Sequence, residues 1–256
     1  MELFTKEDGG FKYLETDPDN EKTLLLLHGL FGALSNFKSI IDLFGQKLNV
    51  VVPLLPIFEL PLRKLSVTGL VDHVNAFVRF KKYTSLNLVG NSLGGHVAIL
   101  FALDRPDLLR SMTLTGSSGL FEAALGSTFP KRGNYEFVQK KTETTFYDPK
   151  VASNDLVDEV YDIVNDRNKA IRVIAIAKSA IRHNIGERLH NIKRPVLLVW
   201  GLNDTITPSF VGEKFKELLP DSHLFLLEKC GHAPMMEHPE EFNRLLQNFL
   251  SEIGEI

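Results

Sequence analysis

The sequence predicts an α/β fold in which a mostly parallel, doubly wound sheet is flanked by helices and interrupted by a helical insertion. Two observations lead to this class. Short, nearly continuous apolar runs recur along the chain, and segments with helical periodicity lie between them. Strands covered on both faces have such runs, and alternation with helices is typical of parallel sheets. At 256 residues and 44% hydrophobic content, the chain is long enough for one such core.

Six apolar runs that end in turn residues are the expected strands. They are residues 23–29, 49–55, 86–92, 111–117, 195–201 and 222–232. Four segments between and after them have helical patterns, namely 66–82, 93–106, 208–220 and 238–253. Pro208 and Pro239 open two of these helices, where a missing backbone N–H costs nothing.

The stretch from 119 to 191 contains no run that resembles a buried strand. It carries several aromatic residues and then two segments with helical patterns, 153–166 and 168–181. We therefore expect residues 1–118 and 192–256 to form the core, and residues 119–191 to form a helical insertion.

Charge and composition favour a small-molecule partner. The 29 basic and 32 acidic residues nearly balance, and no run of five like charges indicates a nucleic-acid or membrane-surface site. The N-terminus lacks a secretory pattern, and no apolar run approaches the roughly 18 residues of a membrane span. The single cysteine, Cys230, excludes an internal disulfide. We expect a cytoplasmic protein without metal or cofactor, and the oligomeric state is left open.

The segment "GNSLG", residues 90–94, matches the pattern G-x-S-x-G. It stands between a buried-strand pattern and a helical one, which is the context of a nucleophile elbow. At such a turn, small neighbours allow strained backbone angles that expose the serine hydroxyl. Ser92 is therefore the candidate nucleophile, and the simpler interpretation is a solvated turn with an N-capping serine.

A serine nucleophile needs a base, and the base needs an acid that orients it. His232 follows the last expected strand, at the end of the sheet where open α/β folds bind ligands. Asp204 follows the strand before it, so the order Ser92, Asp204, His232 is that of nucleophile, acid and base in α/β-hydrolases. Asp204 could instead only shape a turn, with Glu228 and Asp221 as rival acids.

An oxyanion hole needs two preorganised N–H donors. Leu93, directly after the candidate nucleophile, supplies one, and the loop "HGLFG", residues 28–32, supplies the other. Leu30 is the first choice in that loop and Phe31 the second. Phe31 and Asn91 are also the candidate substrate-binding residues, although Asn91 could equally bond only the turn backbone.

These motifs resemble those of capped α/β-hydrolases from about residue 23 to the C-terminus. "GNSLGG", "LLVWGLNDTITP" and "CGHAPMMEHPEEFN" are similar to the branch that contains meta-cleavage-product carbon-carbon hydrolases and related carboxylesterases. The resemblance implies that residues 119–191 form a helical cap. Two departures matter: the early loop reads HGLFG rather than H-G-x-G-P-G, and Ala233 stands where many carbon-carbon hydrolases have tryptophan.

The sequence therefore predicts a serine hydrolase that cleaves an ester or a similar small acyl compound. One alternative is a carbon-carbon bond hydrolase for diketo acids, in which Arg172 would bind the substrate carboxylate. Another is a ligand-sensing protein of the same fold without turnover. Cys230 is expected to be a small buried residue.

Overall fold

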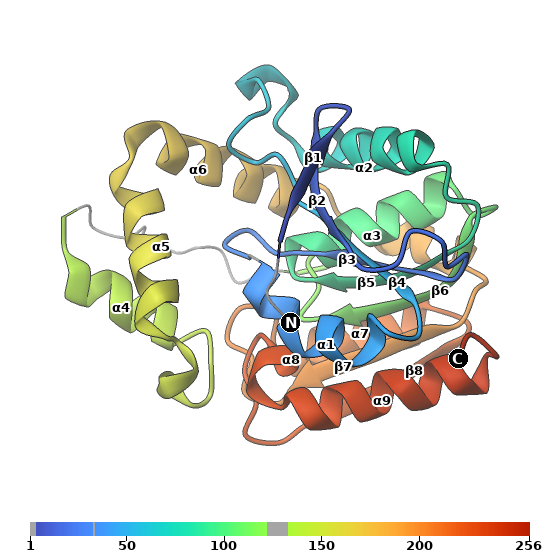
Figure 1. The fold of residues 1–256 in the computed structure, drawn as a ribbon. Helices are drawn as coiled ribbons and strands as arrows, with labels where there is room; N and C mark the ends of the chain where they lie inside the picture. The colour runs from blue at the N-terminus through green and yellow to red at the C-terminus, as the bar shows by residue number, and fades with distance from the viewer. Residues whose placement is uncertain (1–3, 33, 122–132) are drawn as a thin grey trace.

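The computed structural model describes residues 4–32, 34–121 and 133–256, and Figure 1 shows an open twisted sheet between helices. The eight strands of this part of the chain lie in the order β1-β2-β4-β3-β5-β6-β7-β8. Strands β1, β2 and β4 are antiparallel neighbours, and all pairs from β4 to β8 are parallel. The expected mostly parallel, doubly wound sheet is therefore confirmed.

The strands keep close to the apolar runs. Their bounds are β1 Lys6–Asp8, β2 Phe11–Glu15, β3 Thr23–Leu27, β4 Asn49–Pro53, β5 Leu86–Asn91, β6 Leu109–Thr115, β7 Val196–Gly201 and β8 Ser222–Leu227. The α-helices are α1 Lys38–Phe44, α2 Val67–Lys81, α3 Leu93–Asp104, α4 Tyr135–Glu143, α5 Asn154–Asn165, α6 Arg167–Arg182, α7 Ser209–Leu218, α8 Pro234–Glu237 and α9 Pro239–Glu252. Short 3-10 helices cover Leu34–Phe37, Leu62–Lys64, Pro149–Val151 and Gly186–Asn191.

Helices cover both faces of the sheet (Figure 1). In β3, Leu25 and Leu27 pack with residues of α2, α3 and α7, while Leu24 and Leu26 pack with residues of α1 and α9. The two faces of one strand thus enter two different apolar clusters. This arrangement explains why β3, β4, β5 and β7 are buried along their whole length and read as continuous apolar runs.

The sequence reasoning missed the N-terminal hairpin formed by β1 and β2. Its first strand is exposed and polar, so no apolar run marks it. The signal lay in the turn, where Gly9 and Gly10 both have positive φ angles, of 58° and 81°. Two such residues between strands are typical of a tight hairpin turn. Helices α1, α4 and α8 were also not predicted, because each is nine residues or shorter.

Helices α4, α5 and α6 follow one another between β6 and β7 and stand to one side of the sheet (Figure 1). A small apolar cluster joins α4 to α5 through Val138, Val160 and Val164. Helix α6 also contacts the core, since Ser179 Oγ accepts a hydrogen bond of 3.1 Å from the backbone N–H of Val67. Among the described helices, none is both long enough and apolar enough to cross a membrane.

Candidate active site

The backbone at Ser92 is strained, as a nucleophile elbow requires. Ser92 lies between β5 and α3 with φ 55° and ψ −121°, a conformation that is costly for a residue with a side chain. Its carbonyl oxygen accepts hydrogen bonds from the N–H groups of Gly95 and Ser118, at 3.0 and 3.1 Å, which hold the turn in place. A Cβ on Gly94 would lie 1.9 Å from the carbonyl oxygen of Leu27, so only glycine fits there.

His232 and Asp204 form a buried hydrogen-bonded pair. His232 Nδ1 lies 2.9 Å from Asp204 Oδ2. Burial raises the pKa of Asp204, but the charge of His232 and hydrogen bonds from His232, Thr207 and Ile206 outweigh it, and the pKa lies below its usual value. A carboxylate only accepts hydrogen bonds, so His232 Nδ1 carries a proton and donates it to Asp204.

Thr207 completes the surroundings of the Asp204 carboxylate, and the sequence reasoning missed it. Its backbone N–H donates to Asp204 Oδ1 at 2.9 Å, and its hydroxyl donates to Oδ2 at 2.9 Å. Both oxygens are thus held from the same loop that carries the aspartate. The rival acids, Glu228 and Asp221, are exposed and neither is bonded to His232 in the described structure.

The structure brings Ser92 to the same edge of the sheet as the His232–Asp204 pair. Asn91 and Ser92 both bond the Thr115 carbonyl, and the Asn91 amide also donates to the His232 carbonyl at 3.3 Å. Within the described residues, the Ser92 hydroxyl makes no hydrogen bond to His232. Such contacts are often long in ligand-free enzymes and tighten on binding. Asn91 is 4% exposed and ties the β5 turn to the histidine loop, and its substrate-binding role stays a prediction.

The "HGLFG" loop lies against the candidate nucleophile. A Cβ on Gly29 would be 3.2 Å from Ser92 Cβ. His28 fixes this loop, because its Nε2 accepts the Leu55 N–H at 2.9 Å and its Nδ1 lies 2.8 Å from the Gly29 carbonyl. Burial lowers the pKa of His28, so the neutral ring that these two contacts require is favoured.

The two candidate oxyanion donors flank this contact. Leu93 is the first residue of α3, where backbone N–H groups have no acceptor within the helix. Leu30 belongs to the loop that touches Ser92, and its side chain packs against the core. The side chain of Phe31, the second candidate in this loop, packs against the apolar cluster of α4 and α5 instead. Phe31 therefore lies between the core and the inserted helices, and its substrate-binding role stays a prediction.

Arg172 and Cys230, which the sequence analysis named, and the buried His96 have other surroundings. Arg172 Nη1 donates to the Leu60 carbonyl. Cys230 is buried, and burial raises the pKa of its thiol. His96 is fully buried in α3, and burial together with the charge of His183 lowers its pKa to about 3.

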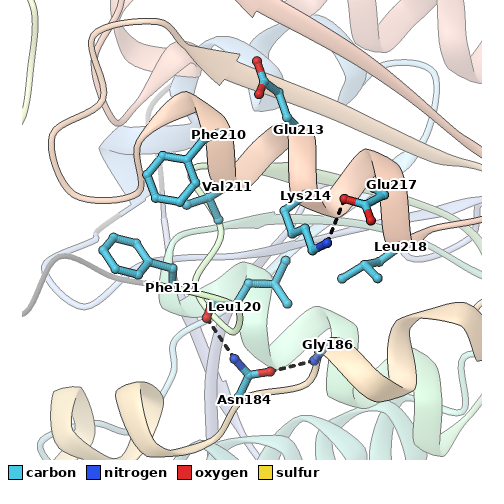
Figure 2. A pocket seen from close by; sticks show the side chains of 10 residues that line it. All are labelled: Leu120, Phe121, Asn184, Gly186, Phe210, Val211, Glu213, Lys214, Glu217 and Leu218. Carbon is cyan, nitrogen blue, oxygen red and sulfur yellow. Dashed lines mark hydrogen bonds and ion pairs between the residues drawn. The ribbon is translucent and has the colours of Figure 1, made fainter.

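A pocket of about 480 Å³ opens beside α7 (Figure 2). The rings of Phe121 and Phe210 contact each other at one end of it, tilted by 53°, and the Lys214 ammonium pairs with Glu217 at 2.7 Å. Its lining contains none of the residues discussed above as nucleophile, acid or base, so it is a separate surface feature. The lining residues are Leu120, Phe121, Asn184, Gly186, Phe210, Val211, Glu213, Lys214, Glu217 and Leu218.

The lack of a side chain at Gly116 leaves room for the His232 imidazole, so a substitution at this position tests the role of His232. With φ 52°, a Cβ on Gly116 would lie 2.7 Å from the His232 carbonyl oxygen and 2.8 Å from Nδ1. We expect Gly116→Ala to displace the imidazole and lower kcat/KM by about 10²-fold. Gly10→Ala is the control, because Gly10 also has a positive φ but nothing lies within 4 Å. Equal activity of the two variants, measured beside their melting temperatures, would contradict the assignment.

The chain is similar to a protein family and to a solved structure. The model of the alpha/beta hydrolase family matches residues 24–245. A solved alpha/beta hydrolase, MGS-MChE2 from a sediment metagenome of the Mar Chica lagoon in Morocco, is 42% identical, with a TM-score of 0.79 and coverage of 97% of this chain and 98% of that one.

Two relatives have names that give different substrates. Monoacylglycerol lipase ABHD6 of Bos taurus is 27% identical over 92% of this chain and 77% of its own length. The 2-hydroxy-6-oxononadienedioate/2-hydroxy-6-oxononatrienedioate hydrolase of Paraburkholderia phymatum is 28% identical over 91% of this chain and 88% of its own length. The chain is thus similar both to a monoacylglycerol lipase and to a hydrolase of 2-hydroxy-6-oxo acids.

Proposed function

The chain belongs to the alpha/beta hydrolase family, and on that premise we propose that it is a serine hydrolase that cleaves a carboxylic ester or a similar small acyl compound. Ser92 attacks the substrate carbonyl, and His232 Nε2 takes the hydroxyl proton and returns it to the leaving group. Asp204 orients the imidazole and stabilises its charged form. The N–H groups of Leu93 and Leu30 bind the oxyanion, and water then hydrolyses the acyl-enzyme.

The single observation that carries this proposal is the buried Asp204–His232 hydrogen bond of 2.9 Å at the sheet edge that holds the strained Ser92. A buried carboxylate and an imidazole are costly to desolvate and serve no apolar core. Their position favours turnover over the alternative of a ligand-sensing protein, because such a protein needs neither a buried acid-imidazole pair nor a strained serine beside it.

We further propose that residues 119–191 act as a cap over this site. The contact of Phe31 with α4 and α5 supports this assignment, since it joins the candidate oxyanion loop to the inserted helices. An acyl group bound between them would be shielded from water. A cytoplasmic location stays part of the same proposal.

A carbon-carbon bond hydrolase is the second candidate, and the relative from Paraburkholderia phymatum favours it. Such an enzyme must hold a dienoate carboxylate, and Arg172 is the cation that the sequence suggested for this task. The contact between the Arg172 guanidinium and the Leu60 carbonyl supports the ester instead. A guanidinium that already donates to the Leu60 carbonyl has fewer N–H donors left for a carboxylate.

Arg172→Ala separates the two candidates. We expect little change in kcat/KM for a short-chain aryl ester, and a small loss of thermal stability because the contact with Leu60 is removed. Arg182→Ala is the control, since Arg182 is exposed on the same helix. The measurement is kcat/KM for the aryl ester and for a 2-hydroxy-6-oxo-dienoate. Efficient dienoate cleavage that disappears in Arg172→Ala would promote the second candidate.

The test of the proposed function is a substrate screen of the purified protein. It uses aryl esters of graded acyl length and includes one 2-hydroxy-6-oxo-dienoate. We expect kcat/KM for at least one short ester to exceed that for the dienoate. A protein that hydrolyses none of these compounds, while folded, would favour the ligand-sensing alternative.

A further inference from the structure

One carboxylate lies beneath the histidine loop and has no part in the proposed chemistry. Glu237 is half-buried at the end of α8, five residues after His232. Its Oε1 accepts the Gly231 N–H at 2.8 Å, and its Oε2 accepts the Tyr147 N–H at 2.7 Å. A carboxylate offers two oxygens to such donors, and bonds to an ionised acceptor are roughly twice as strong as neutral ones.

The segment Thr144 to Tyr147, which donates to this carboxylate, makes further hydrogen bonds to two neighbouring loops. The His232 N–H donates to the Thr145 carbonyl at 2.9 Å, and Thr205 Oγ1 donates to the Thr144 carbonyl at 3.2 Å. This four-residue segment therefore contacts the loop of the candidate base and the loop of the candidate acid. It belongs to the insertion, between α4 and the 3-10 helix at Pro149–Val151.

Apolar packing fixes the same segment. Phe146 is 8% exposed and packs in the core cluster that also contains Ala233 and Met235, on either side of Pro234. A Cβ on Gly231 would lie 2.6 Å from the Thr145 carbonyl oxygen, so the two backbones are in direct contact. The segment and the histidine loop thus touch through backbone bonds and through a shared apolar cluster.

Burial raises the pKa of Glu237 above its usual value, and hydrogen bonds from the N–H groups of Tyr147 and Gly231 offset only part of this shift. The N–H of Gly231, directly before His232, is therefore bonded by the Glu237 side chain, while the N–H of His232 itself is bonded by the Thr145 carbonyl of the insertion. Nothing in this arrangement reaches a reacting atom, so the role of Glu237 acts through His232.

We propose that Glu237 is a positioning residue that clamps the His232 loop to the Thr144–Tyr147 segment, so that the insertion and the catalytic base move as one unit. This inference rests on the proposed function, because it takes His232 as the base. It predicts that loss of the clamp changes the rate of the chemical step and leaves substrate binding intact.

Glu237→Gln tests the clamp. The amide keeps the shape of the side chain, but its NH2 group faces one of the N–H donors. We expect kcat for an aryl ester to fall about tenfold with KM unchanged, since the base is displaced while the acyl site is not. The rate of Ser92 labelling by a fluorophosphonate should fall in parallel. Glu240→Gln is the matched control, because Glu240 is an exposed glutamate at the start of α9.

The outcomes separate this inference from the proposed function. Wild-type protein that is not labelled contradicts the proposed function. Wild-type labelling with an unchanged rate in Glu237→Gln contradicts only the clamp, as does a rise in KM with unchanged kcat.

Hydrogen exchange of the wild-type protein tests the clamp without a variant and without activity. The amides of Tyr147, Gly231 and His232 should exchange at a common rate, because the clamp opens all three together. If His232 and Gly231 exchange while Tyr147 stays protected, the segment and the loop move separately and the clamp is wrong. Because it uses the wild-type protein, hydrogen exchange still tests the clamp if Glu237→Gln does not fold.

Discussion

Ser92→Ala should abolish most of the hydrolysis and leave the fold intact. The covalent route is lost when the hydroxyl is removed, while substrate binding and the N–H donors of Leu93 and Leu30 remain. Removal of a nucleophile that acts together with its base costs on the order of 10⁴- to 10⁶-fold in kcat. The measurement is steady-state hydrolysis of an aryl ester beside circular dichroism.

The control is Ser251→Ala, because Ser251 is an exposed serine of α9 far along the chain from the elbow. It should keep wild-type kcat and KM. The alanine at position 92 also removes a β-hydroxyl from a strained residue without relieving its φ of 55°, so stability should change little. A folded Ser92→Ala protein with wild-type turnover would rule out Ser92 as the nucleophile.

Asp204→Asn should have the next largest effect. The asparagine would keep the size of the side chain and the bonds from the Ile206 and Thr207 N–H groups. It would no longer require a proton on His232 Nδ1, because an amide can donate as well as accept. The imidazole could then adopt the wrong tautomer, a change that costs about 10⁴-fold in kcat in enzymes with this triad.

The control for this variant is Asp221→Asn, which changes the exposed rival acid directly before β8. We expect wild-type kcat for it. KM should be similar in both variants and in the wild type, since neither residue lies in the acyl site. If kcat is unchanged in Asp204→Asn and falls in Asp221→Asn, the acid is Asp221 and not Asp204.

The sheet could be predicted from the sequence because its central strands are buried on both faces. The runs 86–92 and 195–201 predicted β5 and β7 to within one residue at each end. The hairpin of β1 and β2 could not be read in this way, since an edge strand with exposed residues has no apolar run. Helix α4, "YEFVQKKTE", is short and polar and owes its place to packing against α5.

In the candidate site, too, some residues could be predicted from the sequence and others could not. Ser92, Asp204 and His232 follow strand ends, and the chain order alone paired the last two, which lie 2.9 Å apart. Glu237 and Tyr147 are 90 residues apart, so no local pattern could join them. The role of Gly116 depends on a positive φ angle and on a contact with His232 that appear only when the chain is folded.

The most direct test of the central claim is the site of covalent modification by a fluorophosphonate probe. The wild-type protein is incubated with the probe and digested, and the modified peptide is sequenced by mass spectrometry. Only a serine activated by a neighbouring base reacts rapidly. We expect a single adduct, on Ser92 within "LNLVGNSLGGHV", that is absent after Asp204→Asn or Ser92→Ala. No adduct, or an adduct on another serine at the same rate in all three proteins, would contradict it.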